Sequence, residues 1–234
     1  MYTPGTLILN GAYRIEAELG HGAFGVVYRA THLGLNVPRA IKTLRHAAPG
    51  VGSTLFSDYR NRFTLEARLA AGLTHANVIQ VYDFHEQEGV LFCVMEYAPG
   101  GSLADLLAQK TPIAIARVVT YLHEAALGLQ ALHDQLDAVH RDVKPSNLLL
   151  DRQGHLKVAD LGLAQVGGLS ISQRSLVGSM TPPHPGTPNY TSPEHNNGAE
   201  PLAPTADVYG LGCVAFELLT GQAWKSARRK VRKA

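Results

Sequence analysis

The pattern of apolar residues changes near residue 98, and this change constrains the fold more than any other feature of the chain. Before it, apolar side chains alternate over short runs such as Tyr13–Glu18, which favours β-strands. After a Pro-Gly-Gly connector at residues 98–101, they recur at helical spacing. The sequence therefore predicts an α+β protein with two lobes, residues 1–97 and 98–221, followed by a basic tail at 222–234.

The first lobe has the pattern of a small, mostly antiparallel sheet with one helix. Strands are predicted at Tyr13–Glu18, Val26–Tyr28, Pro38–Leu44, Val78–Phe84 and Val90–Tyr97. His46–Ser57 is rich in Gly, Ala and Ser and predicts a loop. A helix is predicted after it, since Phe63, Leu65, Leu69 and Leu73 fall near helical spacing.

The second lobe is predicted to be mainly helical. Thr111 and Pro112 suit the start of a helix whose apolar face would comprise Val118, Leu122, Ala126, Leu129 and Leu132. Short strands at 148–150 and 156–158 flank a turn, and a long loop runs over 166–191. A strongly apolar helix at 205–220 ends at Gly221.

Composition limits the class of protein further. Apolar residues make up 45% and charged residues 17% of the 234 residues, which predicts a globular chain. No apolar run is long enough to cross a bilayer, and Met1 is not followed by a signal-peptide pattern. The two cysteines, Cys93 and Cys213, lie in apolar stretches, which predicts reduced, buried thiols in a cytoplasmic protein.

Charge is unevenly distributed, because the last ten residues carry six Lys or Arg and no acid. Such a run is typical of a solvated tail, and it could also contact anionic lipid or nucleic acid. The rest of the chain has a small excess of acid, so we expect no nucleic-acid binding from it.

The most reactive group of side chains occurs at residues 140–147, with Asp160 eighteen residues after Asp142. The Asp142 carboxylate can orient and deprotonate a hydroxyl group, and Lys144 can neutralise charge on a transferred phosphate. Asn147 and Asp160 supply oxygen atoms that suit Mg²⁺. These residues therefore predict the transfer of a phosphoryl group with the help of a metal ion.

A glycine-rich segment lies near the start of the chain, where Gly20, Gly22 and Gly25 fit the pattern G-x-G-x-x-G-x-V. Glycines let backbone amides approach phosphate oxygens that a Cβ atom would exclude. A tight hairpin or a dinucleotide-binding fold produces the same pattern. A strand follows it here, at Val26, whereas a dinucleotide-binding fold would continue with a helix. The segment is therefore predicted to be a flap that covers a nucleotide.

Taken together, residues 9–221 resemble the eukaryotic-type protein kinases, and local phrases are most similar to bacterial Ser/Thr protein kinases. The resemblance implies the bilobal kinase fold, with ATP and Mg²⁺ or Mn²⁺ as cofactors. It implies that Lys42 grips the α- and β-phosphates and pairs with Glu66. It also implies an adenine site. That site would comprise Val27, Ala40 and Leu149 around the ring, Glu96 and Ala98 at its edge, and Met95 in front of the deeper pocket.

The resemblance implies specificity and regulation as well. Lys144 is characteristic of Ser/Thr kinases, and Thr187 would bond to Asp142 and Lys144. His140 would be a packed structural residue, Arg141 would anchor a phosphorylated loop residue, and Asp207 would hold the catalytic-loop backbone. The loop offers several acceptors for autophosphorylation, namely Ser170, Ser172, Ser175, Ser179 and Thr181.

The chain departs from the family pattern at Ala70 and at Ser192, where larger and smaller residues respectively are usual, and at Arg39 and Leu161. The family pattern also continues for several helices after Gly221, so the large lobe is predicted to be incomplete. We therefore expect a Ser/Thr protein kinase in signalling that phosphorylates protein substrates. The alternative is a catalytically silent, nucleotide-binding or regulatory fragment that needs a partner protein to complete the lobe. A small-molecule kinase is disfavoured by Lys144 and by the segment that ends at Glu194.

Overall fold

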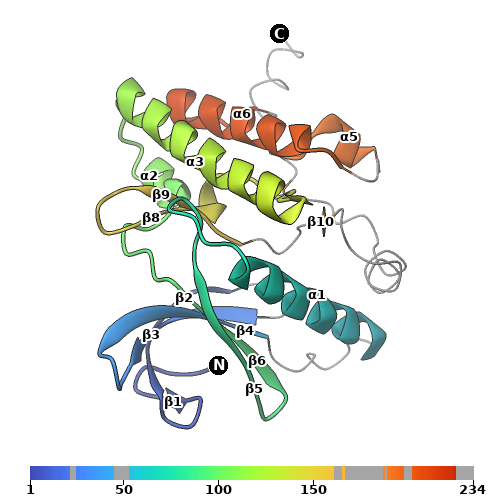
Figure 1. Ribbon diagram of the computed structural model, residues 1–234. Coiled ribbons are helices and arrows are strands. Elements are labelled where there is room, and N and C mark those ends of the chain that lie inside the picture. Colours follow the sequence, from blue (N-terminus) through green and yellow to red (C-terminus); the bar gives the residue numbers. More distant parts are fainter. Residues whose placement is uncertain are drawn as a thin grey trace. The chain divides into compact units, whose positions relative to one another are not determined.

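The computed structural model describes residues 1–21, 25–44, 53–160, 165–166, 187, 189–197 and 202–224. The chain forms two compact units (Figure 1). The first comprises Met1–Thr74 and Ile79–Tyr97, and the second comprises His75–Val78 and the chain from Ala98 onward. Residues 75–78 therefore pack with the second unit, although the chain returns to the first unit after them. Within the described residues, no helix is long and apolar enough to cross a membrane.

The first unit is a six-stranded antiparallel sheet in the order β1-β2-β3-β4-β6-β5, with one helix packed against β5 (Figure 1). The strands are β1 (Leu7–Ile8), β2 (Tyr13–His21), β3 (Gly25–His32), β4 (Val37–Leu44), β5 (Val81–Gln87) and β6 (Val90–Met95). Helix α1 spans Ser53–Ala71 and so begins inside the segment predicted as a loop. Strand β1 was not predicted, since two residues are too short to show alternation.

The outer core of this sheet follows from strand alternation. Tyr28, Ile41 and Val94 lie on three adjacent strands and are fully buried. The register places Lys42 beside Ile41 along β4, so its side chain points to the opposite face of the sheet. Residues of the N-terminal segment, including Ile8, join the apolar face. The opposite face, which carries Lys42, is thereby left to the candidate site.

The second unit contains two long helices and four short β-strands, which form two two-stranded sheets. The described elements are α2 (Leu103–Ala108), α3 (Ile115–Leu136), β7 (Ala138–Val139), the 3₁₀ turn η1 (Pro145–Asn147), β8 (Leu148–Leu150), β9 (Leu156–Val158), β10 (Gln165–Val166), α5 (Pro193–Asn196) and α6 (Thr205–Thr220). Strands β8 and β9 and helix α6 have the predicted bounds. Helix α2 was not predicted, and a capping box between Ser102 and Asp105 starts it.

Helix α3 differs from its prediction at its start and in its buried face. Its N-cap is Ala114, while the Thr111 hydroxyl turns back to the Gln109 carbonyl at 3.5 Å. The buried stripe includes Tyr121 and Ala125, and the predicted core residue Ala126 is exposed. A stripe through Tyr121 and Ala125 fits helical spacing as well as the predicted stripe through Leu122 and Ala126. Only packing against the core shows which of the two is buried.

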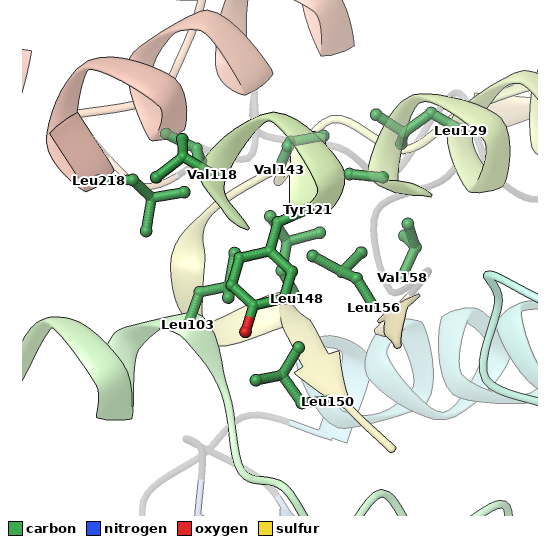
Figure 2. Packing of buried hydrophobic residues seen from close by; sticks show 12 residues of the cluster. Leu103, Val118, Tyr121, Leu129, Val143, Leu148, Leu150, Leu156, Val158 and Leu218 are labelled. Carbon is green, nitrogen blue, oxygen red and sulfur yellow. The ribbon is translucent and has the colours of Figure 1, made fainter. Parts of the chain in front are cut away.

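The core of the second unit lies where α3 and α6 meet β8 and β9 (Figure 2). Leu148 and Leu156 come from the two short strands, Val118 from α3, and Val214 and Leu218 from α6, and all five are buried. These contacts hold fixed the loop that runs from β7 through η1 to β8. That loop carries residues 140–147, so the core positions the candidate site.

Residues 75–78 are bound to this unit by backbone contacts. The Val158 amide donates to the Asn77 carbonyl at 2.8 Å, and Asn77 Nδ2 donates to the Leu156 carbonyl at 2.9 Å. A Cβ atom at Gly128 would lie 2.4 Å from the Asn77 carbonyl oxygen. Glycine at position 128 therefore lets helix α3 approach this segment closely.

Candidate functional site

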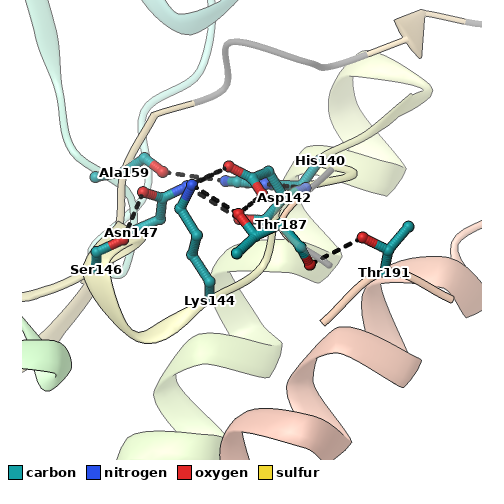
Figure 3. A network of polar contacts seen from close by, with 8 residues as sticks. All are labelled: His140, Asp142, Lys144, Ser146, Asn147, Ala159, Thr187 and Thr191. Carbon is teal, nitrogen blue, oxygen red and sulfur yellow. Dashed lines mark hydrogen bonds and ion pairs between the residues drawn. The ribbon is translucent and has the colours of Figure 1, made fainter. Parts of the chain in front are cut away.

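The loop at residues 140–147 brings together most of the predicted reactive side chains (Figure 3). Asp142 accepts hydrogen bonds at both carboxylate oxygens: Oδ1 from Thr187 Oγ1 at 2.9 Å, and Oδ2 from Lys144 Nζ at 2.5 Å. Lys144 Nζ also donates to Thr187 Oγ1 at 3.1 Å. The Asp142 side chain is only 12% exposed, so its orientation is set by these partners. The result is a carboxylate held by one cation and one hydroxyl group.

Asn147 completes this cluster from η1. Its Nδ2 donates to the Asp142 carbonyl at 2.9 Å and lies 3.3 Å from Asp142 Oδ2. Both contacts use the amide nitrogen, which leaves the side-chain oxygen Oδ1 facing away from Asp142, and the Ser146 hydroxyl lies 3.5 Å from that oxygen. The amide is therefore oriented with its oxygen available as a ligand.

Asp160 is held near Asn147 by the backbone, because the Ala159 amide donates to the Asn147 carbonyl at 2.9 Å. The Asp160 carboxylate is exposed, and its φ angle of 63° lies in the left-handed region that non-glycine residues rarely adopt. One amide oxygen and one carboxylate match the few protein ligands that Mg²⁺ takes when phosphate and water complete its shell. The residues present thus fit a magnesium ion. Among the described residues, no group of three or more His, Cys, Asp or Glu side chains forms a metal cluster.

His140 links the two segments that carry these groups. It is fully buried, its Nε2 donates to the Ala159 carbonyl at 3.0 Å, and its Nδ1 accepts from the Asp142 amide at 3.3 Å. A carbonyl can only accept and an amide can only donate, so these contacts describe a neutral imidazole with its proton on Nε2. Both ring nitrogens are engaged, which makes His140 a structural link and not a base.

Asp207 of α6 holds the loop from below. Its Oδ1 accepts from the Arg141 amide and its Oδ2 from the His140 amide, each at 2.8 Å. Oδ2 also lies 2.8 Å from His133 Nε2, and the Asp207 side chain has no exposure. A Cβ atom at Gly210 would lie 3.0 Å from Val143, so α6 runs very close to the loop. These hydrogen bonds are those that a residue holding the backbone of the loop would make, which is the role predicted for Asp207.

In the first unit, the structure brings Lys42 and Glu66 together. Lys42 Nζ lies 3.0 Å from Glu66 Oε1, and their side chains are 26% and 16% exposed. Lys42 comes from β4 and Glu66 from α1, so the pair depends on how the helix packs on the sheet. The register also places Val27, Ala40 and Met95 on the face of the sheet that carries Lys42.

Gly20 and Gly25 differ in how much space surrounds them. A Cβ atom at Gly25 would lie 2.2 Å from the Thr43 carbonyl oxygen, so close strand packing requires glycine there. A Cβ atom at Gly20 would meet no atom of the described residues within 4 Å. Space at position 20 is thus compatible with a ligand, whereas Gly25 is explained by the sheet itself. Gly22 lies outside the described residues.

Other predicted positions are described only in part. Glu96 is tied to Gln80 by two contacts: its amide donates to the Gln80 carbonyl at 2.8 Å, and its Oε2 accepts from the Gln80 amide at 3.3 Å. Leu149 lies in β8 beside Lys157 of β9, and Ala98 belongs to the same second unit. The predicted phosphorylation sites and the basic tail lie outside the described residues; they are Ser170, Ser172, Ser175, Ser179, Thr181 and residues 225–234.

Two residues that stabilise the site were missed by sequence reasoning. His133 contacts Asp207 from α3, and the Tyr190 hydroxyl donates a short hydrogen bond to Glu217 of α6. Burial and then the Glu217 carboxylate raise the pKa of Tyr190. These partners lie 74 and 27 residues apart, so no periodicity could have linked them. The position of each residue beside a motif was the only available signal.

Comparison with known proteins agrees with this geometry. Residues 13–233 match the protein kinase domain family, and the chain belongs to that family. The chain is 35% identical over 221 residues to the serine/threonine-protein kinase pkn3 of Myxococcus xanthus, a match that covers 89% of this chain and 38% of the relative. It is 33% identical to PknA of Corynebacterium glutamicum (92% and 44% covered) and 36% identical to PknB of Mycolicibacterium smegmatis (92% and 33% covered). The chain thus spans between a third and a half of the length of these relatives.

Proposed function

We propose that this chain is the catalytic region of a Ser/Thr protein kinase that transfers the γ-phosphate of ATP to hydroxyl groups of protein substrates. The observation that carries the proposal is the Asp142 carboxylate, which is held between the Lys144 ammonium and the Thr187 hydroxyl. Relatives that bear the name serine/threonine-protein kinase support the class of acceptor. Residues 1–97 would form the small lobe, 98–221 the large lobe and 222–234 a tail.

The roles of the residues follow from their chemistry. Asp142 would orient the acceptor hydroxyl and take its proton on a carboxylate oxygen, while Lys144 offsets negative charge beside it. Lys42, held by Glu66, would bind nucleotide phosphates, and Asn147 and Asp160 would hold Mg²⁺ or Mn²⁺ through oxygen atoms. When bound, ATP with its metal ion supplies the phosphoryl group and neutralises its charge.

The nucleotide would lie against the predicted glycine and adenine positions. These are Gly20, Gly22, Gly25, Val27, Ala40, Met95, Glu96, Ala98 and Leu149. Thr187 would help to select Ser or Thr acceptors through its contacts with Asp142 and Lys144. We further propose autophosphorylation in the loop before Thr187, and action in the cytoplasm, where ATP is available.

A direct test is transfer of label from γ-labelled ATP with Mg²⁺ to a generic basic protein, followed by identification of the phosphorylated residues. We expect label on Ser and Thr, reduced by about 10²–10⁴-fold in Asp142→Asn and abolished in Asp160→Ala. Asp134→Asn is the matched control, because Asp134 is an exposed acid on α3 away from the site. Equal label in Asp142→Asn and in the unchanged protein would contradict the proposal.

The second candidate is a silent nucleotide-binding fragment that needs a partner. It is favoured by exposed apolar side chains on α6, where Val208 is 65% and Leu219 54% exposed. ATP binding by calorimetry without any transfer of label would support this candidate. Transfer that depends on Asp160 would exclude it.

A further inference from the structure

Helix α1 contacts the sheet through three residues spaced three apart, Arg60, Phe63 and Glu66. Residues three apart are neighbours on a helix surface, so Phe63 lies beside both Arg60 and Glu66. Arg60 Nη1 donates to the Gly89 carbonyl at 3.2 Å, and its Nη2 lies 2.5 Å from Glu86 Oε2. This first contact ties α1 to the turn between β5 and β6. Glu66, at the other end, reaches Lys42.

Phe63 lies between these two contacts and is only 7% exposed. Its ring packs against Phe84 of β5 with a centroid separation of 6.0 Å and an interplanar angle of 45°. The ring is thus packed against the sheet. The Lys42 ammonium lies over the same ring, 5.7 Å from the centroid.

The same ammonium therefore meets a carboxylate and an aromatic face from one helix. A cation over the face of an aromatic ring within about 6 Å is attracted by the negative charge density of that face. The Lys42 side chain is 26% exposed, so part of its surface is already removed from water. Because Phe63 and Glu66 share a helix face, any rotation of α1 would change both contacts together.

We propose that Phe63 is a positioning residue for Lys42: its ring supports the ammonium together with Glu66, so that Lys42 is preorganised to bind nucleotide phosphates. This inference rests on the proposed function, since it assumes that Lys42 binds nucleotide. It adds an aromatic support to the Lys42–Glu66 pair. The residue is neither charged nor part of any motif identified in the sequence.

The test replaces Phe63 by phenylalanine with one, two or three ring fluorines, introduced at a reassigned stop codon. Fluorine withdraws charge from the ring face and leaves the volume nearly unchanged, so it weakens the attraction without creating a cavity. We expect the affinity for Mg²⁺·ATP, measured by calorimetry, to fall stepwise by roughly two- to fivefold over the series. The kcat of phosphoryl transfer should stay within about twofold, since the contact serves binding.

The same proteins provide a readout that needs no nucleotide and no activity. With one fluorine at Phe63, the ¹⁹F resonance should shift when Lys42 is replaced by Met. Lys110→Met, which removes an exposed lysine at the end of α2, is the control and should leave the resonance unchanged. Phe63→Leu removes the ring and should lower the affinity for ATP. Phe63→Tyr keeps the ring and should retain that affinity. Thermal unfolding midpoints would confirm that each variant is folded.

A ¹⁹F resonance that ignores Lys42→Met, or an ATP affinity that is constant across the fluorine series, would overturn the inference. Failure of the proposed function looks different. In that case the ¹⁹F shift and the graded ATP affinity persist, while no variant, nor the unchanged protein, transfers phosphate. That pattern would support the role of Phe63 and contradict kinase activity.

Discussion

Thr187 Oγ1 lies 2.9 Å from Asp142 Oδ1, although 45 residues separate them in the chain. The hydroxyl thus occupies one carboxylate oxygen while Lys144 occupies the other. A carboxylate held at both oxygens keeps little orientational freedom. The segment that carries Thr187 is therefore coupled to the orientation of the proposed base.

This coupling predicts that Thr187→Ala lowers kcat by about 10- to 100-fold, because the Asp142 carboxylate becomes free to rotate away from the acceptor. Thr187→Ser retains the hydroxyl and should keep most of the activity. Initial rates at saturating ATP and substrate measure the effect. If the Ser and Ala variants were equally impaired, the methyl group and not the hydrogen bond would be responsible.

The buried Asp207 carboxylate is predicted to be a major source of stability. Asp207→Asn places an amide nitrogen where backbone amides and His133 now meet a carboxylate, which should cost about 3–5 kcal/mol. Urea unfolding followed by circular dichroism measures the change. Asp134→Asn makes the same chemical change on an exposed part of α3 and should alter the free energy of unfolding by less than about 0.5 kcal/mol.

Gly20 in β2 and Gly25 at the start of β3 should respond differently to alanine. At Gly25 the added methyl group would lie 2.2 Å from the Thr43 carbonyl oxygen, so Gly25→Ala should lower the free energy of unfolding by about 1–3 kcal/mol. The methyl group of Gly20→Ala would meet no atom within 4 Å in the part of the chain that the structure describes, so this change should alter the free energy of unfolding by less than about 0.5 kcal/mol. Thermal and urea unfolding of both variants provide the comparison. Similar losses at both positions would contradict the difference in space that the structure gives around Gly20 and Gly25.

Alkaline conditions should weaken the contact between Tyr190 and Glu217. The folded state raises the pKa of Tyr190, so the neutral phenol is favoured when the chain is folded. The associated stability is complete below the pKa of an unfolded tyrosine, about 10, and is lost as the pH rises above it. We expect the stability difference between the unchanged protein and Tyr190→Phe to shrink from about pH 9 to about pH 11.

Urea unfolding at several pH values tests this directly. Comparison with Tyr190→Phe is essential, because burial also raises the pKa of Tyr13 and raises that of Cys93 to about 12. Both groups are present in both proteins, so their effects cancel in the difference. A difference that does not depend on pH would show that Tyr190 contributes through packing alone.

Much of the local structure was predictable from short stretches of sequence. Strand β8 was predictable from its short apolar run of three leucines, which a turn follows. The end of α6 was predictable at Gly221, because glycine accepts the left-handed φ angle of 67° found there. The start of α1 and the cap of α3 were not predictable. Helix ends without a capping side chain leave little trace in the sequence, and Ala114 has none.

In the candidate site too, features of neighbouring residues were predictable from the sequence, whereas the geometry of contacts between distant segments was not. Asp142, Lys144 and Asn147 are neighbours along the chain, so their spacing already indicated the chemistry that they could perform. The contact between Lys42 and Glu66 was expected from resemblance, but its distance depends on the packing of α1 against β5. Phe63 was predicted only as an apolar residue of a helix. Its place under an ammonium could not be read from any pattern.

The sequence by itself determined which reactive groups exist, which of them lie within one turn or loop of each other, and which family the chain resembles. These properties depend on backbone dihedral preferences and on spacing over a few residues. The resemblance implied that Thr187 meets Asp142 and that Asp207 holds the loop, but only the tertiary structure gave the geometry of these contacts. It alone showed that His133 contacts Asp207 and that Lys42 lies over the ring of Phe63. Such contacts join distant segments, and they form because burying the apolar cores brings those segments together at fixed positions.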